Sequence, residues 1–497
     1  MKYVYLLVFS CSCWLTQAQT ALFNNRGADM YVMPGAYMIV KADSLHNHTG
    51  SIQNAGDIVV EGNIYNDATL TGGSSTPTGL YQIHGDWINN GVVNSYNDSV
   101  QLAGGAQFIG GTQPTPFHHL ILAGTPGSVK TQLVDASVDG VLNLSDHELA
   151  TENNEMLVLN TAPSAIVKGT GPNGFVSSLG AGRLTRATAS TSPYLFPLGT
   201  PSAIAGKPFY YRPVEMKPAG AAANRFGGRL VHEPLADSYD PESFEDALCK
   251  VNPLFYHRLY HSSGADAASI KVFFDKANDG AWSDLAQWRS EWKYMPVASV
   301  ASAGGFSTVE VKNWTNFSTF PFALASKKFV VDAGADQEIL PGATANLDPV
   351  ITISDATIQW IPSTYLDFDN IARARSTPSE SLEYTLQVTN AVGCKASDQV
   401  KITILPDALL VPTGFSPNGD GANDLMRPLN TNLDEVEFQV FNRWGEKVFE
   451  TTNTADGWDG TYKGVKQDLG VYVWKAVYRL TGSSERRSAS GNFTLVK

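Results

Sequence analysis

The chain has 497 residues, of which 43% are hydrophobic and 17% charged, and its formal net charge is −13. This composition excludes an intrinsically disordered chain, because disorder requires low hydrophobicity together with high net charge. The acidic balance argues against a nucleic-acid partner, since acidic surfaces repel phosphate backbones. With 44 Gly and 26 Pro, the sequence favours short strands joined by tight turns, arranged in several domains.

Residues 1–18 have the features of a cleaved secretory signal peptide. Lys2 supplies a positive charge before the apolar run Tyr3–Trp14, which is shorter than the roughly 20 residues needed to span a bilayer. Thr16 and Ala18 then place small residues at a signal-peptidase site. A lipoprotein signal, with Cys11 as the lipidated residue, is the alternative.

Residues 19–195 contain repeated short apolar segments, each closed by Gly or Asn. Examples are Gly56–Asn63, Gly85–Gly91 and His119–Gly124. Gly and Asn tolerate the left-handed backbone of a sharp corner. Strands this short bury a core only when successive coils stack. We therefore predict a β-solenoid of the parallel β-helix type, with a β-sandwich as the alternative.

Two histidine pairs lie in this region, His46 with His48 and His118 with His119. No carboxylate or cysteine stands beside either pair in the sequence to complete a metal site. Exposed loop histidines are therefore expected rather than metal ligands.

Residues 196–328 are richer in aromatics and Pro, and their alternating segments predict an antiparallel β-sandwich domain. Pro241–Ala247 and Ser283–Trp288 are the two segments that resemble short helices. Trp282, Trp288 and Trp292 form a candidate sugar-stacking platform, and packing in the sandwich core is the competing interpretation.

Residues 329–405 have the size of an immunoglobulin-like domain. Trp360 lies in the middle, and Tyr384–Asn390 alternates as a strand on a facing sheet would. The segment resembles the PKD-like and Ig-like repeats of bacterial surface proteins. Relatives often carry a cysteine where this chain has Leu340, so the resemblance implies that Cys394 is a free thiol. Cys249 and Cys394 are expected not to pair.

Residues 411–497 carry five motifs in order. They run from Val411–Asp424 through Phe438–Phe449, Gly457–Gly464 and Gly470–Trp474 to the final strand Gly491–Lys497. This series resembles the type B C-terminal sorting domain of type IX secretion, also called the gliding-motility-associated C-terminal domain. The resemblance implies a C-terminal β-sandwich sorting domain that the outer-membrane translocon and its sorting receptor recognise. The motif residues are Phe415, Pro417, Asn418, Gly419, Asp420, Gly421, Asn423, Asp424, Asn442, Arg443, Trp444, Gly445, Gly457, Trp458, Asp459, Gly460, Gly470 and Tyr472.

Four of these motif residues also form a candidate calcium loop: Asn418, Asp420, Asn423 and Asp424 place four oxygen-bearing side chains close together, and calcium takes 6–8 oxygen ligands. A turn whose Asx side chains bond their own backbone is the competing interpretation. No other cofactor is expected.

The sequence as a whole predicts an all-β protein exported through the periplasm to the outer cell surface or the medium. An adhesive or structural role without catalysis is expected, with a surface-anchoring membrane protein and an extracellular glycan as further candidate partners. An extracellular polysaccharide-binding protein is the alternative. A β-helix polysaccharide-degrading enzyme is a third possibility, but Asp135, Asp139 and Asp146 suggest no acid–base pair of the kind glycosidases use.

Overall fold

The computed structural model describes residues 21–73, 79–170, 173–202, 210–232, 239–317, 320–481 and 483–497. It confirms the all-β class, with 53% strand and 2% helix. The chain divides into two compact units, residues 1–328 and 329–497. The predicted signal peptide, residues 1–18, lies outside the described residues. Within the described part, no helix is long and apolar enough to cross a membrane.

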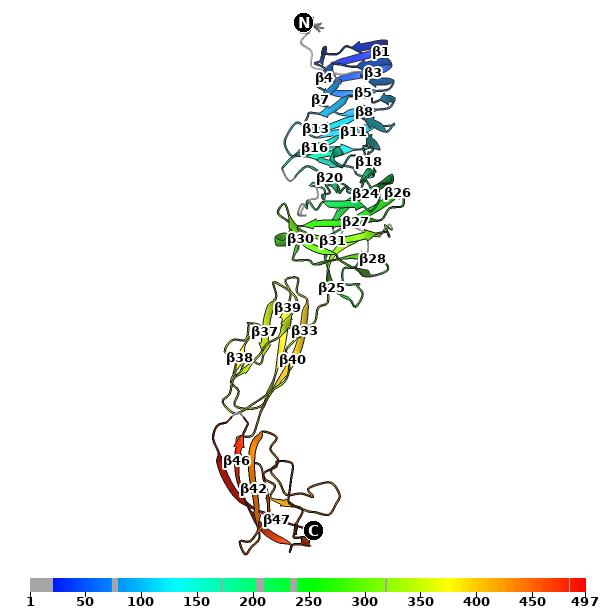
Figure 1. The fold of residues 1–497 in the computed structure, drawn as a ribbon. Coiled ribbons are helices and arrows are strands. Elements are labelled where there is room, and N and C mark those ends of the chain that lie inside the picture. Colours follow the sequence, from blue (N-terminus) through cyan, green and yellow to red (C-terminus); the bar gives the residue numbers. More distant parts are fainter. Residues whose placement is uncertain are drawn as a thin grey trace. The chain divides into compact units, whose positions relative to one another are not determined.

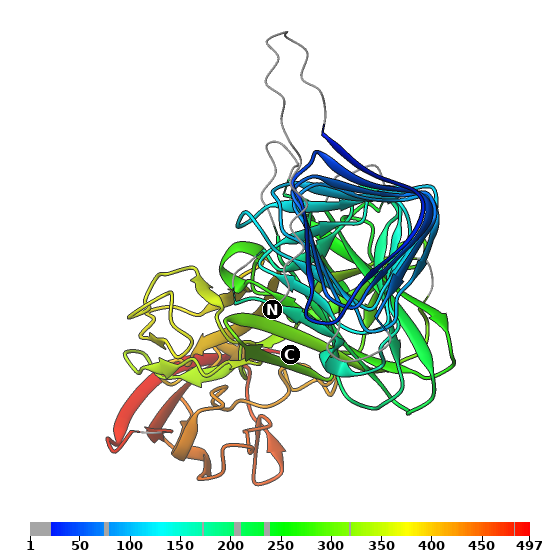
Figure 2. The same cartoon turned by 90° about the horizontal axis from the view of Figure 1, so that it is seen from above.

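An N-terminal β-solenoid of about six turns opens the first unit and confirms the fold prediction for this region (Figure 1). Its coils superpose when viewed along the solenoid axis (Figure 2). The short strands line up in three parallel faces. One face contains β3 (Ser44–Asn54), β5 (Asn63–Asn66), β8 (Trp87–Asn89), β11 (Gln107–Gly111), β14 (Val129–Gln132), β17 (Glu148–Ala150) and β20 (Phe175–Ser177), with β1 (Leu22–Val32) beside β3. A second face contains β2 (Tyr37–Val40), β4 (Asp57–Val60), β7 (Leu80–Ile83), β10 (Ser99–Leu102), β13 (His119–Leu122), β16 (Leu142–Ser145) and β19 (Ile166–Lys168).

The third face begins on the second half of β3, which turns a corner at Gly50. There β3 pairs with β6, whereas its first half pairs with β5. The face continues through β6 (Thr69–Gly72), β9 (Val92–Asn94), β12 (Thr115–Phe117), β15 (Ala136–Val138), β18 (Glu155–Val158) and β21 (Arg183–Thr188).

The parallel register builds a continuous apolar column. Ile58, Tyr81, Val100, Leu120 and Leu142 are successive partners along the second face, and all are buried. The distance in sequence between neighbours varies from 19 to 23 residues. The strands keep their register while the corners absorb this variation, which is why the repeat looks irregular in the sequence.

A ladder of buried asparagines runs beside this column. The side-chain amides of Asn25, Asn47 and Asn66 each donate to the side-chain oxygen of the asparagine one coil further on, over 2.9, 3.0 and 2.8 Å, and the ladder ends at Asn89. The same amides also donate to backbone carbonyl oxygens at the corners, as Asn47 does to Thr69 over 3.0 Å. The asparagines thus satisfy corner backbone groups that stacking alone leaves unpaired.

The third solenoid face continues without a break into the following β region. β21 pairs antiparallel with β24 (Asn224–His232), and the sheet extends through β26 (Phe255–Ser263), β32 (Phe322–Lys327), β28 (Asp284–Trp288) and β29 (Trp292–Met295), with β25 (Leu248–Val251) on β32. A second sheet contains β22 (Tyr194–Phe196), β23 (Val214–Pro218), β27 (Ala268–Phe274), β31 (Phe306–Trp314) and β30 (Ser299–Ala303). One sheet therefore serves both the solenoid and the region after it.

The helix predictions for this region are wrong. Residues 284–288 form strand β28, which pairs with β32 on one side and β29 on the other. Leu285 and Ala286 of this strand are buried in the core. Residues 241–247 form turns and a bridge. Among the described residues of this region, the helix is α1 (Lys276–Asp279), which Asp275 caps by accepting a hydrogen bond from the Ala277 backbone N–H over 3.0 Å.

Residues 329–405 of the second unit build a small core around Trp360. A four-stranded sheet contains β34 (Gln337–Ile339), β40 (Lys395–Ile404), β39 (Leu382–Thr389) and β37 (Thr357–Ile361), and two strand pairs accompany it: β33 (Val331–Asp332) with β36 (Val350–Ile351), and β35 (Ala345–Asn346) with β38 (Arg375–Ser376). Trp360 is fully buried and donates its indole N–H to the Ile371 carbonyl over 3.0 Å. Tyr384, Leu386 and Val388 pack against it from β39.

The prediction that Cys394 is a free thiol is wrong. Cys249 and Cys394 are both disulfide-bonded. The leucine at position 340 removes one expected partner, but it does not prevent a bond elsewhere. Disulfides also persist in the oxidising compartments through which an exported chain passes.

The last domain is a five-stranded sheet in the order β41 (Gly414–Phe415), β47 (Arg487–Leu495), β46 (Gly470–Leu480), β42 (Leu433–Phe441) and β43 (Lys447–Thr451). A two-stranded sheet, β44 (Thr461–Tyr462) with β45 (Val465–Lys466), accompanies it. Alternate residues of β46, from Tyr472 to Leu480, are buried. β47 pairs with β46 along its length, and its last residues, Thr494 and Leu495, also pair with β41 on the other side.

Candidate functional site

The second tryptophan of the sorting motif is the centre of the C-terminal core. Trp458 is 1% exposed and packs against the rings of Phe415, Tyr472 and Phe493, with centroids 5.6, 4.7 and 6.0 Å away. Its indole N–H donates to the Thr461 carbonyl over 2.7 Å. These motif residues therefore hold the domain together rather than presenting a surface.

Two motif glycines occupy positions where a side chain would collide with neighbouring residues. A Cβ at Gly457 would lie 2.8 Å from the Leu425 side chain, and Gly460, with φ +79°, lies against Pro417. Gly470 also has a positive φ, +141°, at the start of β46. Asp459 accepts the backbone N–H of Thr461 over 2.9 Å and so fixes the turn after Trp458.

The first motif tryptophan has the opposite environment. Asn442–Gly445 forms the turn between β42 and β43, where the Asn442 side chain accepts the backbone N–H groups of Trp444 and Glu446, each over 3.0 Å. Gly445 has φ +80°. Trp444, at the tip, is 82% exposed. A large aromatic side chain held outward on a rigid turn is typical of a recognition element.

Further exposed apolar residues lie at the start of β46, on the segment that an ion pair joins to this turn. Arg443 forms an ion pair with Asp468 over 3.1 Å, which ties the turn to the segment before β46. Leu469, Val471 and Val473 follow there and are exposed. We call Trp444, Leu469, Val471 and Val473 the apolar sorting face.

The candidate calcium loop uses its carboxylates on its own backbone. Asp424 accepts the backbone N–H groups of Gly419 and Gly421 over 2.7 and 2.8 Å, and Asp420 accepts that of Ala422 over 2.8 Å. Gly419, Gly421 and Asn423 have positive φ angles, as the tight turns require. The hydrogen bond from Ala422 and one from Asn418 lower the pKa of Asp420. Calcium binding stays a prediction.

Two of the three candidate sugar-stacking tryptophans are closed to a ligand. Trp282 and Trp292 are 4% and 1% exposed, and their indole N–H groups donate to the Asp279 and Asp240 carbonyls. Trp288 is half-buried and meets Trp292 edge to face at 5.5 Å across the β28–β29 hairpin. This arrangement matches the competing interpretation, core packing, because a sugar ring needs an exposed indole face.

The first histidine pair has a carboxylate neighbour that the sequence hides. His46 Nε2 lies 2.5 Å from Asp67 Oδ2, and His48 Nδ1 lies 3.3 Å from the same oxygen. The expectation of loop histidines is therefore wrong for this pair, since both lie on strand β3 and the next coil supplies a carboxylate. Hydrogen bonds from Asn90 and His46 lower the pKa of Asp67.

The second histidine pair is arranged differently. His118 Nδ1 lies 2.6 Å from Asp139 Oδ1, whereas His119 Nδ1 accepts the backbone N–H of Val141 over 2.9 Å. The two imidazoles thus have separate partners. Burial lowers the pKa of His119.

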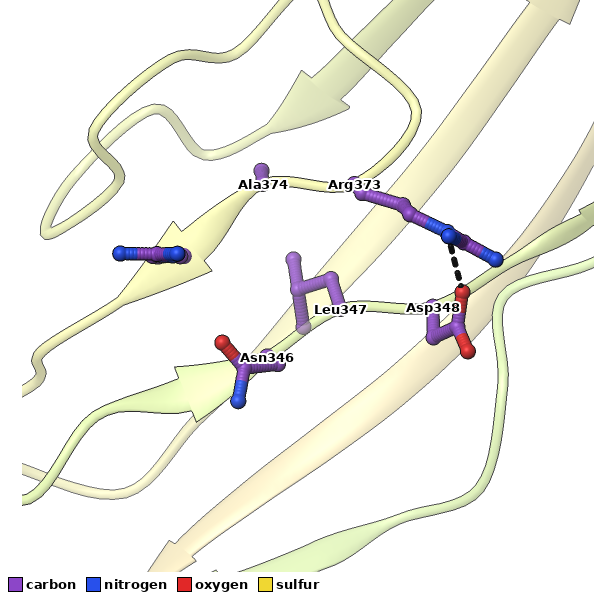
Figure 3. Close-up of a pocket in the computed structure, with 6 residues that line it drawn as sticks. Asn346, Leu347, Asp348, Arg373 and Ala374 are labelled. Atoms are coloured by element: carbon purple, nitrogen blue, oxygen red, sulfur yellow. Dashed lines mark ion pairs between the residues drawn. The ribbon is translucent and has the colours of Figure 1, made fainter.

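A shallow pocket of about 290 Å³ lies in the 329–405 domain (Figure 3). The Asp348 carboxylate and the Arg373 guanidinium form an exposed ion pair at its edge, 2.7 Å apart. None of the residues that the sequence singles out lines it. The lining residues are Asn346, Leu347, Asp348, Arg373, Ala374 and Arg375.

The C-terminal domain, with its buried motif core and outward turn, belongs to the class of protein-sorting domains. Residues 409–495 match the family model of the CHU_C type IX secretion signal domain. This domain directs export across the outer membrane to the cell surface or the extracellular space, and it implies an interaction with the type IX secretion machinery.

Comparison with solved structures gives matches of low TM-score. Dimeric latent PorU from Porphyromonas gingivalis is 8% identical, with a TM-score of 0.13, over 57% of this chain and 31% of that one. The FN1–FN3 domains of chicken CNTN1 are 7% identical, with a TM-score of 0.14, over 47% and 97% of the two chains. Extracellular cadherin domains 1–4 of protocadherin gamma B7 are 12% identical, with a TM-score of 0.18, over 54% and 91%. No curated protein matches the sequence.

Proposed function

We propose that this chain is a surface-displayed protein with an adhesive or structural role and no catalytic activity. The observation that carries the proposal is the type IX secretion signal domain at residues 409–495, attached to a long β-solenoid. The stacked apolar column and the buried asparagine ladder make the solenoid a rigid body. Its outward residues are then the part available to partners.

The positions of the solenoid carboxylates support a role without catalysis. Asp135 accepts the backbone N–H of Glu155 over 2.8 Å, Asp139 pairs with His118, and Asp146 accepts the backbone N–H of Asn173 over 3.0 Å. Each carboxylate has its own structural partner, whereas glycoside cleavage needs two carboxyl groups that face one bond.

The apolar sorting face is the surface that we assign to the sorting receptor of the translocon. A group of exposed apolar residues that includes a tryptophan is typical of a protein-binding site. We propose that this face contacts an apolar surface of the receptor, which also supplies a hydrogen-bond acceptor for the indole N–H of Trp444. The outward side chains of Val471 and Val473 extend this face along β46.

Export in the native cells tests this assignment. We expect Trp444→Ala to reduce surface delivery severalfold, measured by protease accessibility on intact cells, with the chain accumulating in the periplasm. Leu429→Ala is the matched control, because Leu429 is 60% exposed in the same domain but lies outside the motifs. Normal delivery of Trp444→Ala would overturn the assignment of the face. Normal delivery after deletion of residues 409–497 would overturn the sorting function itself.

The adhesive role has its own test. Cells that export the full chain are compared with cells that export a version lacking residues 21–328, since the solenoid and the following region share one sheet. We expect loss of attachment to surfaces or neighbouring cells, with equal amounts of the two proteins at the surface. Unchanged attachment and cell-envelope integrity would contradict the proposal, as would polysaccharide cleavage by the purified full chain.

A further inference from the structure

A cluster of two imidazoles and one carboxylate lies on the outside of the solenoid near its N-terminal end. His46 and His48 alternate outward on β3, whereas Leu45 and Asn47 between and beside them point into the core. The ligand atoms of His46, His48 and Asp67 all lie within 4.8 Å of one another. Within the described part of the chain, no other group of three potential metal-ligating side chains is this close.

Coil stacking brings these residues together. β3 and β5 pair in parallel, with His46 opposite Tyr65 and Asn47 opposite Asn66, so the residue after β5 falls beside His48. Asp67 is that residue, 21 positions after His46 and 19 after His48. The site therefore bridges two consecutive coils.

A third coil holds the carboxylate in place. The side-chain amide of Asn90 donates to Asp67 Oδ1 over 2.9 Å, which leaves Oδ2 toward the two histidines. The ring of Tyr65 packs beside that of His46, with centroids 5.7 Å apart. Such outer contacts orient metal ligands and fix the oxygen that faces the ion.

From this geometry we propose that His46, His48 and Asp67 form a binding site for a divalent transition-metal ion, with zinc as the best match. Imidazole nitrogen suits zinc, copper and nickel, while calcium and magnesium prefer sites made of oxygen alone. Three protein ligands leave a position open for water or an external ligand.

The two ligand pairs that share Asp67 Oδ2 need adjustments of at most roughly an ångström to accept the ion. Zinc, with ligand distances of about 2.0 to 2.2 Å in a tetrahedron, separates its ligand atoms by about 3.4 Å. The pair His48 Nδ1 and Asp67 Oδ2 is already 3.3 Å apart. The pair His46 Nε2 and Asp67 Oδ2, at 2.5 Å, must open by roughly an ångström as the ion replaces their hydrogen bond.

The bound ion would cross-link two coils. A ligand that binds only the folded chain stabilises it in proportion to the logarithm of its concentration over its dissociation constant. Zinc is therefore expected to raise the melting temperature of the solenoid.

A zinc titration of the full mature chain tests the proposal. Isothermal titration calorimetry should show one zinc ion per chain at this site. The affinity should fall by at least about tenfold when a ligand is removed, in His46→Ala, His48→Ala and Asp67→Asn. It should fall by about ten- to a hundredfold in Asn90→Ala, which removes the contact that orients Asp67. His118→Ala is the matched control, because it removes a similar exposed histidine paired with Asp139. It should bind zinc like the wild type. Equal zinc affinity in all variants, or no stoichiometric binding by the wild type, would overturn the proposal.

Two further measurements separate metal ligation from folding. Without metal, His46→Ala, His48→Ala and Asp67→Asn should melt close to the wild type, since all three side chains face outward. Zinc should raise the melting temperature of the wild type and of His118→Ala, but not that of these three ligand variants. Copper(II) electron paramagnetic resonance should show coupling to two nitrogen ligands, falling to one in either His46→Ala or His48→Ala. Unchanged nitrogen coupling in both variants would rule out these histidines as ligands.

Discussion

The side-chain amide of Asn47 donates to the side-chain oxygen of Asn66 over 3.0 Å, between neighbouring coils of the solenoid, and both side chains are fully buried. Each amide has a second acceptor at a corner carbonyl, Thr69 for Asn47 and Val92 for Asn66. Because each amide serves two coils at once, the ladder couples the fold of one coil to that of the next.

Removing one member of this ladder should destabilise the solenoid. Asn66→Ala leaves the side-chain oxygen of Asn89 and the carbonyl of Val92 without their donor, and an unsatisfied buried polar group costs about 1 to 3 kcal/mol. Chemical denaturation followed by circular dichroism measures the loss. Asn94→Ala, on an exposed position of β9, is the control and should stay within about 0.5 kcal/mol of the wild type. Equal stability of the two variants would show that the ladder contributes nothing.

A buried ion pair is a second sensitive point in the first unit. The Arg212 guanidinium donates to both carboxylate oxygens of Asp279, to Oδ1 over 2.6 Å, and both side chains are buried. Asp279→Ala leaves the guanidinium charged and unpaired in the core, so we expect a loss of about 3 to 5 kcal/mol in the free energy of unfolding. Asp246→Ala breaks the exposed pair with Lys328 and should leave the same unfolding transition unchanged. A small effect of Asp279→Ala would mean that water reaches Arg212.

The pH dependence of stability should show the effect of a buried carboxyl group. Burial raises the pKa of Asp98 to about 6, compared with about 3.9 in an unfolded chain. Between these two values the folded state holds more protons than the unfolded state, so the free energy of unfolding falls as the pH rises from about 4 to about 6. The loss contributed by Asp98 is on the order of 2 kcal/mol.

Asp98→Asn isolates this contribution, since the amide is neutral at every pH. Near pH 4, where Asp98 is largely protonated, the variant and the wild type should have similar stability, which serves as the internal control. Above pH 6 the variant should be the more stable by on the order of 2 kcal/mol. A stability difference that does not change with pH would contradict the raised pKa.

The solenoid and the sorting domain could be predicted because their signals are local. Glycines and asparagines mark each corner, and the motifs around Trp458 lie in one short stretch. The cluster of His46 and Asp67 could not be predicted in this way, because its members are 21 residues apart and the coil length varies. Only the register decides which residue of the next coil lies beside a histidine.

Burial also separated residues that look equivalent in the sequence. Trp444 and Trp458 are both motif tryptophans followed closely by glycine, yet one is exposed on a turn and the other is the core. The strand β28 resembled a helix because a central strand covered on both faces has no polar–apolar alternation, and Asp284, Leu285, Ala286 and Gln287 are all buried. Environment, rather than residue type, decides these cases.

The final strand offers a prediction that links packing to export. Gly491 lies opposite Trp474 in the β46–β47 pairing, and a Cβ at position 491 would lie 2.9 Å from the indole nitrogen of Trp474. Gly491→Val should therefore displace the indole or β47, at a cost of about 1 to 3 kcal/mol typical of overpacking. Thermal unfolding of the purified chain measures this loss, and Ser490→Ala, on the exposed neighbouring position, is the control.

Export of Gly491→Val then distinguishes two ways in which the signal could be recognised. If the receptor recognises the folded domain through the apolar sorting face, surface delivery should fall in step with domain stability, and lowering the growth temperature should restore it. Ser490→Ala should be delivered normally at both temperatures. If the receptor instead recognises the last residues as an extended segment, loosening β47 should leave export unchanged or increase it. The second result would contradict recognition of a folded face.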